Sequence, residues 1–254
     1  MALYFIGMGL HDAKDISLKG LEIVKRCDYV YYEYYTGKLN SAIDELEKLY
    51  GKKLILADRE LVEKRCEETI LKHAIGSDVA LLVVGDPMSA TTHIDLMLRA
   101  KEMRIKTIVV NNASVITAVG ITGLQVYKFG KTTSIPYPEE NFKPHTAYDV
   151  IKLNKNNGLH TLILLDLRPL EDRYMSVNEA IQILLDIEKE RNEQVFNENT
   201  KVIGCARLGS LNPTIISGKA EDVKNKDFGS PVHCLIVPGK MHFIEEEAFK
   251  LWEC

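Results

Sequence analysis

The residues best suited to chemistry lie in turns that directly follow apolar segments. Asp86 is the clearest case, because Gly85-Asp-Pro87 ends an almost continuous aliphatic run over residues 79–84. Such a run predicts a strand buried on both faces, and Pro87 cannot continue a β-ladder. Ligands of open α/β sheets bind at the carboxyl ends of the strands. Asp86 can serve as a ligand contact or as a turn former, and we expect it to mark the rim of the active site.

Other turns rich in small residues follow or begin predicted strands in both halves of the chain. Each turn alone is more typical of structure than of function. Their recurrence suggests one ligand held between two domains by backbone groups and a few side chains. In chain order they comprise residues 7–10, 85–89, 112–115, 164–166, 206–210 and 232–235.

The polar residues of these turns also have structural interpretations. Ser114 precedes a predicted helix, where the usual role of serine is the N-cap. His233 lies in an apolar strand, where a packed and hydrogen-bonded histidine is commoner than a catalytic one. Asp166 ends a strand and is ambiguous. Cys205 and Cys234 lie in apolar strands and are expected to behave as small hydrophobic residues.

The familiar catalytic motifs are missing from the sequence. It contains no GxSxG elbow, no GxxxxGK[ST] phosphate loop and no HExxH helix. The usual signals for acyl transfer, phosphoryl transfer and metal-assisted hydrolysis are therefore absent. Gly7-Met-Gly9 begins a dinucleotide fingerprint, but Asp12 stands where that motif needs glycine or alanine.

Composition narrows the class of protein. The 254 residues carry 32 basic and 36 acidic side chains, for a net charge of −4, without a basic tract. Nucleic acid is therefore not expected as the main partner. The longest apolar runs are too short to span a bilayer. The five cysteines are widely spaced and form no CxxC pair, which predicts reduced thiols in the cytoplasm and no metal site.

The first half of the chain alternates between predicted strands and helices. Strands are expected at about 3–6, 29–35, 53–56, 79–84 and 106–110, and helices at 15–26, 41–49, 59–74 and 92–104. This alternation predicts a mainly parallel sheet with helices on both faces. Thr92 and Asp95 have the spacing of a capping box. The aromatic residues over 29–35 are most simply explained by sheet packing, with Glu33 either exposed at an edge or directed towards a cleft.

A loop-rich zone over residues 120–144 separates the halves. Beyond it, helices are expected at 146–155, 177–189 and 244–252, and strands at 161–167, 201–206, 214–217 and 232–237. The closer spacing of these strands predicts a mixed sheet. We therefore expect an α/β protein with one α/β domain over residues 1–130 and another over 131–254.

Distinctive short motifs extend along nearly the whole chain, from Leu3 to about His242. The most specific are Gly85-Asp-Pro-Met-Ser-Ala-Thr-Thr-His93 and Tyr127-Lys-Phe-Gly130. Further segments are residues 3–10, 15–21, 112–114, 120–124, 173–180, 206–210 and 237–242. Together these segments resemble the diphthine synthase family, which lies within the wider tetrapyrrole-methylase class.

The resemblance implies a tetrapyrrole-methylase-like fold, a homodimer, and S-adenosylmethionine folded into the cleft between two α/β domains, with no metal. The implied substrate is elongation factor 2 carrying a modified histidine, whose aminocarboxypropyl arm is methylated on nitrogen. Carried over position by position, the cofactor contacts fall on Leu10, Asp86, Ser89, Ser114, Val115, Leu165, Leu208 and His233. At Ser89 and Leu208, where the family varies, backbone contact is expected.

The resemblance leaves the product open between two branches. Residues 12–15, 57–60 and 83–86 look eukaryotic, which implies diphthine methyl ester, whereas residues 209–213 look archaeal, which implies trimethylation only. We favour the ester. A methyltransferase acting on a tetrapyrrole precursor and a non-catalytic nucleotide-binding module are the alternatives.

Methyl transfer from a sulfonium needs no covalent enzyme nucleophile, because the donor is already activated and leaves as a neutral thioether. The expected task of the protein is to orient the reactants. No catalytic residue is therefore assigned. The attacking amine must still lose a proton. Asp86, Asp166 and His233 are candidate proton acceptors by location alone.

Overall fold

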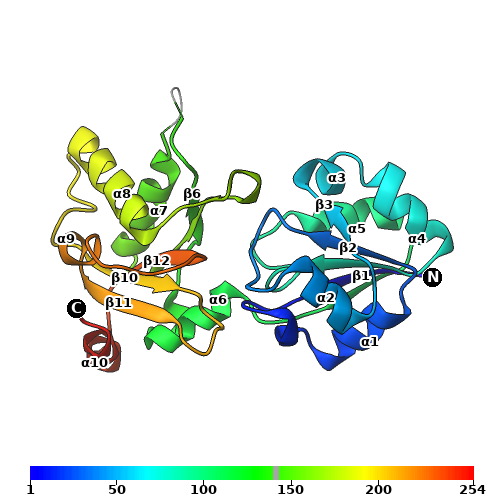
Figure 1. The fold of residues 1–254 in the computed structure, drawn as a ribbon. Helices are drawn as coiled ribbons and strands as arrows, with labels where there is room; N and C mark the ends of the chain where they lie inside the picture. Colours follow the sequence, from blue (N-terminus) through cyan, green and yellow to red (C-terminus); the bar gives the residue numbers. More distant parts are fainter. Residues whose placement is uncertain (140–142) are drawn as a thin grey trace. The chain divides into compact units, whose positions relative to one another are not determined.

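The structure is a computed structural model that describes residues 1–139 and 143–254 (Figure 1). It contains two compact units, Met1–Val115 and Ile116–Cys254. The expected domain boundary after residue 130 falls inside the second unit and stays a prediction. No helix among the described residues combines the length and apolar character needed to cross a bilayer.

The first unit is built on a five-stranded sheet in the order β3-β2-β4-β1-β5, and every pair of neighbours is parallel. The strands are β1 (Leu3–Gly7), β2 (Tyr29–Glu33), β3 (Ile55–Ala57), β4 (Val79–Val83) and β5 (Thr107–Val110). All residues of β1 and β4 are buried, which confirms the two-sided burial predicted from the aliphatic run. Gly7 pairs with Val83, so the carboxyl ends of these central strands lie side by side.

Helices cover both faces of this sheet. They are α1 (Leu18–Arg26), α2 (Ile43–Tyr50), α3 (Arg59–Glu63), α4 (Lys72–Gly76) and α5 (His93–Glu102). The short α6 (Val115–Ala118) begins at the last residue of this unit. Ile6 packs in an apolar cluster with residues of α1 and α2. Phe5 points to the other face, into a cluster with residues of α4 and α5. The alternation of side chains along β1 therefore builds two separate cores.

Three local expectations for this unit were wrong. The helix expected over 59–74 is interrupted by a π-helical turn, Glu67–Leu71, where Ile70 and Leu71 both reach the core. The helix expected from Asp15 begins at Leu18, because Ser17 Oγ accepts the amide of Gly20 at 3.1 Å. The capping box at residues 92–95 does not form, because Asp95 pairs with Arg99 at 2.9 Å instead.

The second unit contains a mixed sheet in the order β11-β10-β12-β7-β6. Its strands are β6 (Thr133–Ile135), β7 (Thr161–Leu165), β10 (Lys201–Ala206), β11 (Thr214–Lys219) and β12 (His233–Val237). Only β6 and β7 pair in parallel, as the mixed-sheet prediction allows. The sequence did not indicate β6, because a three-residue edge strand is too short to show periodicity.

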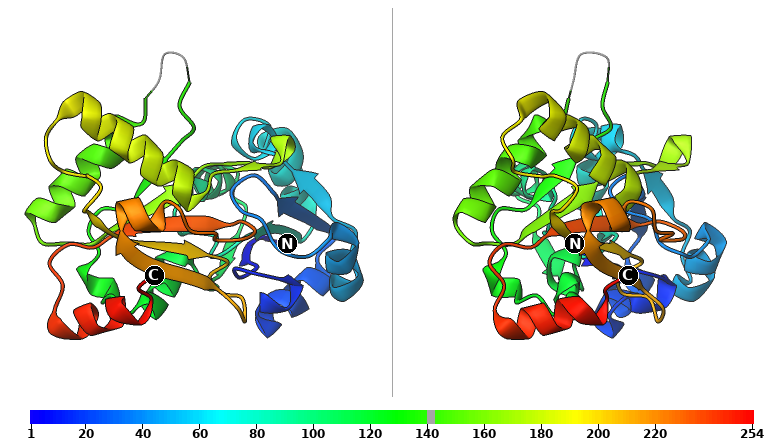
Figure 2. Two further views of the ribbon diagram at one scale, coloured as in Figure 1. Left: turned by 60° about the vertical axis from the view of Figure 1, so that its left-hand side comes forward. Right: turned by 90° about the vertical axis from the view of Figure 1, so that its left-hand side faces the viewer.

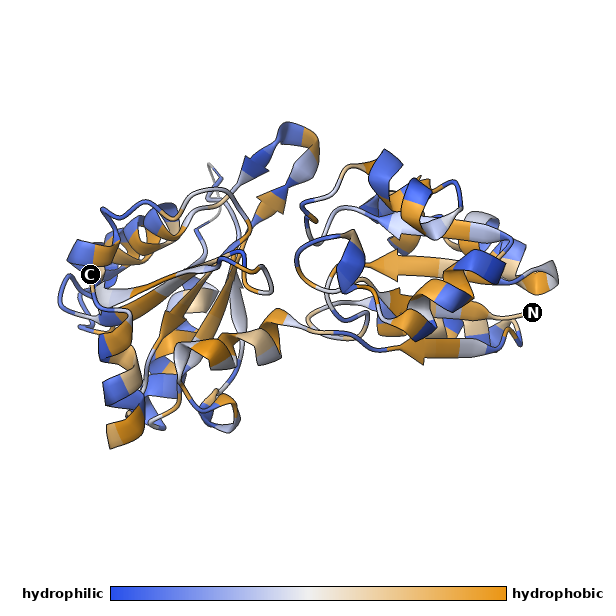
Figure 3. Cartoon of the chain, turned by 60° about the horizontal axis from the view of Figure 1, so that its bottom comes forward, coloured by the Kyte–Doolittle hydropathy of each residue, from blue (hydrophilic) through white to orange (hydrophobic). Residues whose placement is uncertain are grey.

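Helices α7 (His145–Asn156) and α8 (Val177–Arg191) pack together on one face of this sheet (Figures 1 and 2). Tyr148, Leu184 and Leu235 belong to the core between them and the strands. The remaining helices are α9 (Ala220–Val223) and α10 (Phe243–Leu251). Central strands such as β1 and β4 are strongly hydrophobic, whereas the helices contain both hydrophilic and hydrophobic residues (Figure 3). Buried sheets with amphipathic coverings are the expected form of an α/β protein.

A two-stranded antiparallel ribbon follows the end of β7. It consists of β8 (Leu167–Arg168) and β9 (Arg173–Tyr174), joined by a single 3₁₀ turn over Pro169–Glu171. The amide of Met175 donates to the Asp166 carbonyl at 3.0 Å, which ties both ends of the ribbon together.

Candidate functional site

Five of the eight expected cofactor residues lie in the first unit, in loops that follow three neighbouring strands. Leu10 follows β1, Asp86 and Ser89 follow β4, and Ser114 and Val115 follow β5. Strands β4, β1 and β5 are adjacent and parallel, so all three loops leave the same edge of the sheet. We call residues 7–15, 84–89 and 111–115 the N-terminal loop cluster.

Asp86 holds this cluster together. Its Oδ1 accepts the Met88 amide at 2.9 Å and the Ser89 hydroxyl at 3.2 Å. Its Oδ2 accepts the Asn111 side-chain amide at 3.0 Å and the Asn112 backbone amide at 3.1 Å. Burial raises the pKa of a carboxyl group, but here these four donors outweigh it and hold the pKa of Asp86 below its usual range. Asp86 is therefore an ionised structural tie between the β4 and β5 loops, and its contact with a cofactor stays a prediction.

Asn112 makes the second connection within the cluster, which its position after a predicted strand did not by itself indicate. Its side-chain amide donates to the carbonyls of Gly7 and Asp15, both at 2.9 Å. The Gly85 amide donates to the Gly9 carbonyl at 2.7 Å. A Cβ on Gly7 would stand 2.6 Å from both Asn112 Cβ and the Gly85 carbonyl oxygen, so only glycine allows this close approach.

A buried histidine–glutamate pair contacts the turn that contains Asp86 and Pro87. Nδ1 of His93 lies 2.9 Å from the Pro87 carbonyl, and Nε2 lies 2.7 Å from Glu33 Oε2. Their side chains are 1% and 0% exposed. A carbonyl can only accept, so Nδ1 donates to Pro87, and the nearby carboxyl group of Glu33 favours the charged form of the ring. Glu33 is therefore buried beside His93, and the alternative that placed it exposed at an edge is wrong.

The pKa of His93 reflects this arrangement. Burial opposes the charged ring, but the contact with Glu33 and the hydrogen bond to the Pro87 carbonyl raise the pKa above its usual value. The contact with Glu33 is a close ion pair without good hydrogen-bond alignment, since neither Glu33 Oε2 nor His93 Nε2 has a well-directed partner among the described residues.

The other three expected cofactor residues meet at one edge of the second sheet. Leu165 ends β7, His233 begins β12, and Leu208 follows β10. Cys234 pairs with Leu164, and His233 pairs with Ala206, so the three strands bring these positions into one row. We call this group the C-terminal loop cluster. Their contact with a cofactor remains a prediction.

His233 presents an unused acceptor in this cluster. Its Nε2 lies 3.2 Å from the carbonyls of both Gly229 and Ser230 and must therefore donate. Burial lowers the pKa of His233, so the ring is neutral and Nδ1 carries a lone pair. That Nδ1 is buried and has no hydrogen-bond partner among the residues described. A buried acceptor without a partner is costly unless something completes it.

Arg207 shapes the loop on which His233 depends, and the sequence analysis missed it. Its guanidinium donates to the carbonyls of Phe228 and Ser230 at 2.7 and 2.6 Å and to the Thr214 hydroxyl at 2.5 Å. Its own backbone has a φ of 53°, in the left-handed region that a side chain seldom adopts. Three hydrogen bonds thus stabilise an unfavourable conformation next to the cluster.

Asp166 is mainly a structural acceptor. It takes the amides of Tyr137 at 2.9 Å and Leu167 at 3.0 Å. Cys205 and Cys234 face each other across β10 and β12, and their mutual contact together with burial raises the pKa of Cys205. Cys205 therefore does not resemble an activated thiolate. Within the described ranges, no group of three or more metal-ligating side chains comes together.

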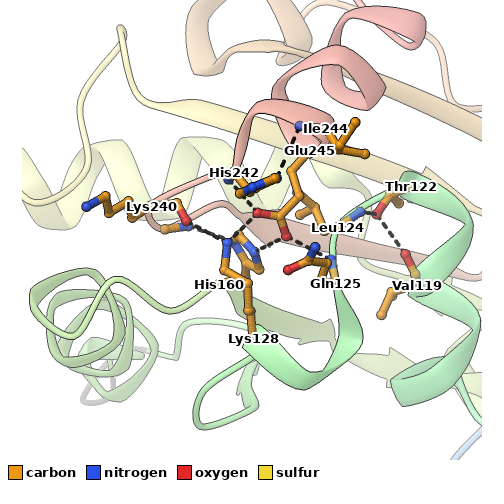
Figure 4. A network of polar contacts seen from close by, with 11 residues as sticks. Val119, Thr122, Leu124, Gln125, Lys128, His160, Lys240, His242, Ile244 and Glu245 are labelled. Atoms are coloured by element: carbon orange, nitrogen blue, oxygen red, sulfur yellow. Dashed lines mark hydrogen bonds and ion pairs between the residues drawn. The ribbon is translucent and has the colours of Figure 1, made fainter.

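A second buried carboxylate, at the start of α10, explains several family-like motifs (Figure 4). Glu245 accepts the amides of Gln125 and His242 at 2.9 and 2.7 Å, the His160 ring at 3.0 Å and the Lys128 ammonium. Burial would raise the pKa of Glu245, but these donors lower it to about 2. The motifs at 120–124, 127–130 and 237–242 therefore meet in one structural network.

A family model described as Tetrapyrrole (Corrin/Porphyrin) Methylases matches residues 2–224. The chain is 47% identical over 245 residues to a diphthine synthase of Methanococcus aeolicus, covering 96% of this chain and 95% of that protein. It is also 47% identical over 272 residues to a probable diphthine methyl ester synthase of Arabidopsis thaliana, covering 99% and 98%.

Solved structures show the same likeness. The crystal structure of a putative diphthine synthase from Entamoeba histolytica matches with a TM-score of 0.90 and 41% identity, covering 100% of this chain and 98% of that one. The similarity therefore includes both units and both loop clusters.

Proposed function

This chain belongs to the tetrapyrrole (corrin/porphyrin) methylase family, and on that premise we propose that it methylates the aminocarboxypropyl-modified histidine of elongation factor 2. It is an S-adenosylmethionine-dependent methyltransferase of diphthamide biosynthesis. The observation that carries this conclusion is the similarity over nearly the full length to proteins named diphthine synthase and diphthine methyl ester synthase. A tetrapyrrole precursor as substrate has no comparable support among these relatives.

The loop clusters fit a cofactor of this kind in two respects. Nδ1 of His233 is a buried acceptor that lacks a partner among the described residues. It could accept a hydrogen bond from an amino group of an adenine ring. Gly85 has a φ of 79°, a conformation that residues with a side chain rarely adopt, and the absence of a side chain lets its backbone approach a ligand closely. We propose that S-adenosylmethionine is bound through Leu10, Asp86, Ser89, Ser114, Val115, Leu165, Leu208 and His233.

The arrangement of the chain's own groups suits methyl transfer. The bound sulfonium supplies an activated methyl group and departs as a neutral thioether, so no enzyme nucleophile is needed. What the chain contributes is a fixed geometry, because Asp86 and Asn112 lock the loops at the carboxyl ends of three strands. Orientation of this kind accounts for several kcal/mol of a barrier, about 7–11 in well-aligned intramolecular reactions.

We propose the ester product, reached by successive transfers to nitrogen and then to the carboxylate. The motifs at residues 12–15, 57–60 and 83–86 support this proposal. Overall identity does not distinguish the two products, because the Methanococcus aeolicus and Arabidopsis thaliana relatives are both 47% identical to this chain. We also propose that the protein is a cytoplasmic homodimer. The five cysteines are all free, which agrees with a reducing compartment.

The decisive experiment combines the purified protein with S-adenosylmethionine and elongation factor 2 bearing the aminocarboxypropyl histidine. Mass spectrometry then counts the methyl groups that are added. We expect four added methyl groups. Three added methyl groups would show that the product is trimethylated on nitrogen and is not an ester. Unmodified elongation factor 2 is the control. Failure to methylate the modified factor, with normal binding of S-adenosylhomocysteine in a calorimetric titration, would refute the proposed substrate.

A further inference from the structure

The ribbon formed by β8 and β9 carries an unusual pairing of like charges. Arg168 and Arg173 stand opposite each other in the antiparallel register. Both guanidinium groups also lie over the ring of Tyr137, at 5.2 and 3.7 Å from its centroid. Like charges directly opposite in a ribbon destabilise it. An anion or an aromatic face must therefore compensate for them.

The two arginines are compensated very differently. Arg168 is surrounded by carboxylates, with Glu139, Asp166 and Glu171 at 3.1, 3.8 and 3.9 Å. Arg173 forms no ion pair with any carboxylate in the part of the chain that the structure describes, and its side chain is exposed. Its guanidinium is therefore held by an aromatic ring while its N–H donors remain available for an anion.

Tyr137 is a rigid support for Arg173. Its side chain is only 3% exposed, and its backbone amide donates to Asp166 at 2.9 Å. Its buried hydroxyl lies beside Arg173 without a well-aligned hydrogen bond to any described residue. A planar cation stacked on a fixed ring loses little freedom on binding a planar carboxylate, which favours recognition through two parallel hydrogen bonds.

The ribbon also begins at the sheet edge that carries the C-terminal loop cluster. Leu165 and Arg168 are separated by only two residues, and His233 lies beside Leu165 on the neighbouring strand. Arg207, the other arginine near this edge, already donates hydrogen bonds to Phe228, Ser230 and Thr214. Arg173 is thus the arginine near this cluster that can still bind an external anion.

We propose that Arg173, stacked on Tyr137, binds the carboxylate of the substrate's aminocarboxypropyl arm. This inference rests on the proposed function, which requires an arm that carries both an amine and a carboxylate. A guanidinium that holds the carboxylate orients the amine and distinguishes the modified histidine from an unmodified one. The three residues of the C-terminal loop cluster, Leu165, Leu208 and His233, offer no guanidinium of their own.

The test compares Arg173→Gln and Arg173→Lys with the unchanged protein in the methylation of modified elongation factor 2. Loss of a charge-assisted pair is expected to raise KM for the modified factor by about 10- to 100-fold. The lysine variant keeps the charge but not the fork, so it should recover only part of the loss. Affinity for S-adenosylhomocysteine and the thermal transition should not change, because Arg173 is exposed.

Arg191→Gln is the matched control. Arg191 also stacks on a tyrosine, 4.6 Å above Tyr148, but it is already paired with Asp149 and Glu193 at 2.6 and 2.9 Å. Its loss should leave KM unchanged. An equal rise in KM for both variants would show a general effect of losing a stacked arginine and would overturn the inference.

A second measurement separates binding of the carboxylate from a structural role. The free modified histidine is used as a competitor, with the arm prepared either as a carboxylate or as a carboxamide. The unchanged protein should prefer the carboxylate, and Arg173→Gln should show no preference. A preference retained in Arg173→Gln would refute the assignment. If the unchanged protein does not methylate the modified factor at all, the proposed function fails first, and this result is distinct from both outcomes.

Discussion

Replacement of His93 by glutamine should destabilise the first unit and remove part of its pH dependence. The substitution leaves the Glu33 carboxylate fully buried, where the backbone amide and hydroxyl of Thr36 donate to it. Breaking a buried ion pair by removing one partner costs about 3–5 kcal/mol, because the other charge remains without water. Glutamine can still donate to one of the two former partners, so we expect a loss of about 3 kcal/mol in the free energy of unfolding.

The double substitution Glu33→Gln with His93→Gln should cost less than the sum of the single ones. It removes the charge together with its partner, and the two side chains are in direct contact at 2.7 Å. Contacting residues show coupling energies of about 0.5–3 kcal/mol in such cycles. Urea unfolding, followed by the fluorescence of a probe placed in the first unit, measures all four proteins. Additive losses would refute a paired, ionised His93.

The pH dependence gives an independent check on the charge of His93. Because folding raises its pKa above 6.5, its contribution is fully present below pH 6.5 and is lost as pH rises through the folded value. The buried His160 provides the contrast, because burial lowers its pKa and its contribution is lost as pH falls below 6.5. His93→Gln should therefore flatten the alkaline side of the stability profile and His160→Gln the acidic side. Flattening on the acidic side by His93→Gln would mean that the ring is neutral.

Three further outcomes are expected. Asp86→Ala should lower the free energy of unfolding by about 2–3 kcal/mol in urea titrations, because buried amides lose their acceptor; an unchanged value would show that the four hydrogen bonds are not structural. Gly204→Ala should cost about 1–3 kcal/mol by thermal unfolding, since its Cβ would lie 2.4 Å from Phe228, whereas Gly76→Ala meets nothing within 4 Å and should be tolerated. Glu245→Gln should abolish the stability that is present above pH 4.5 and lost as pH falls towards 2, as seen in unfolding at acidic pH.

Much of the architecture could be predicted from local patterns. Continuous aliphatic runs such as residues 79–83 require burial on both faces, so they identify central strands wherever they occur. Strands and helices in alternation then imply a parallel sheet, and the loops at the carboxyl ends follow from that topology. The positions of Asp86 and Ser114 at one edge were therefore accessible from the sequence. Short elements such as β6 were not, because three residues carry too little periodicity.

Pairing between distant side chains could be decided only by the tertiary structure. His160 and Glu245 are 85 positions apart, and Gln125 reaches Glu245 across 120. The residues around Glu33 in the sequence do not indicate that its partner is His93. Nor do the residues around Asp86 indicate that its carboxylate accepts hydrogen bonds from Asn111 and from the Asn112 amide. Hydrophobic burial follows local composition, whereas a buried charge is stable only when a specific partner lies within a few ångströms. The sequence by itself therefore determines the local strands and helices. The ionisation and role of each polar residue depend on which distant segment the fold brings into contact with it.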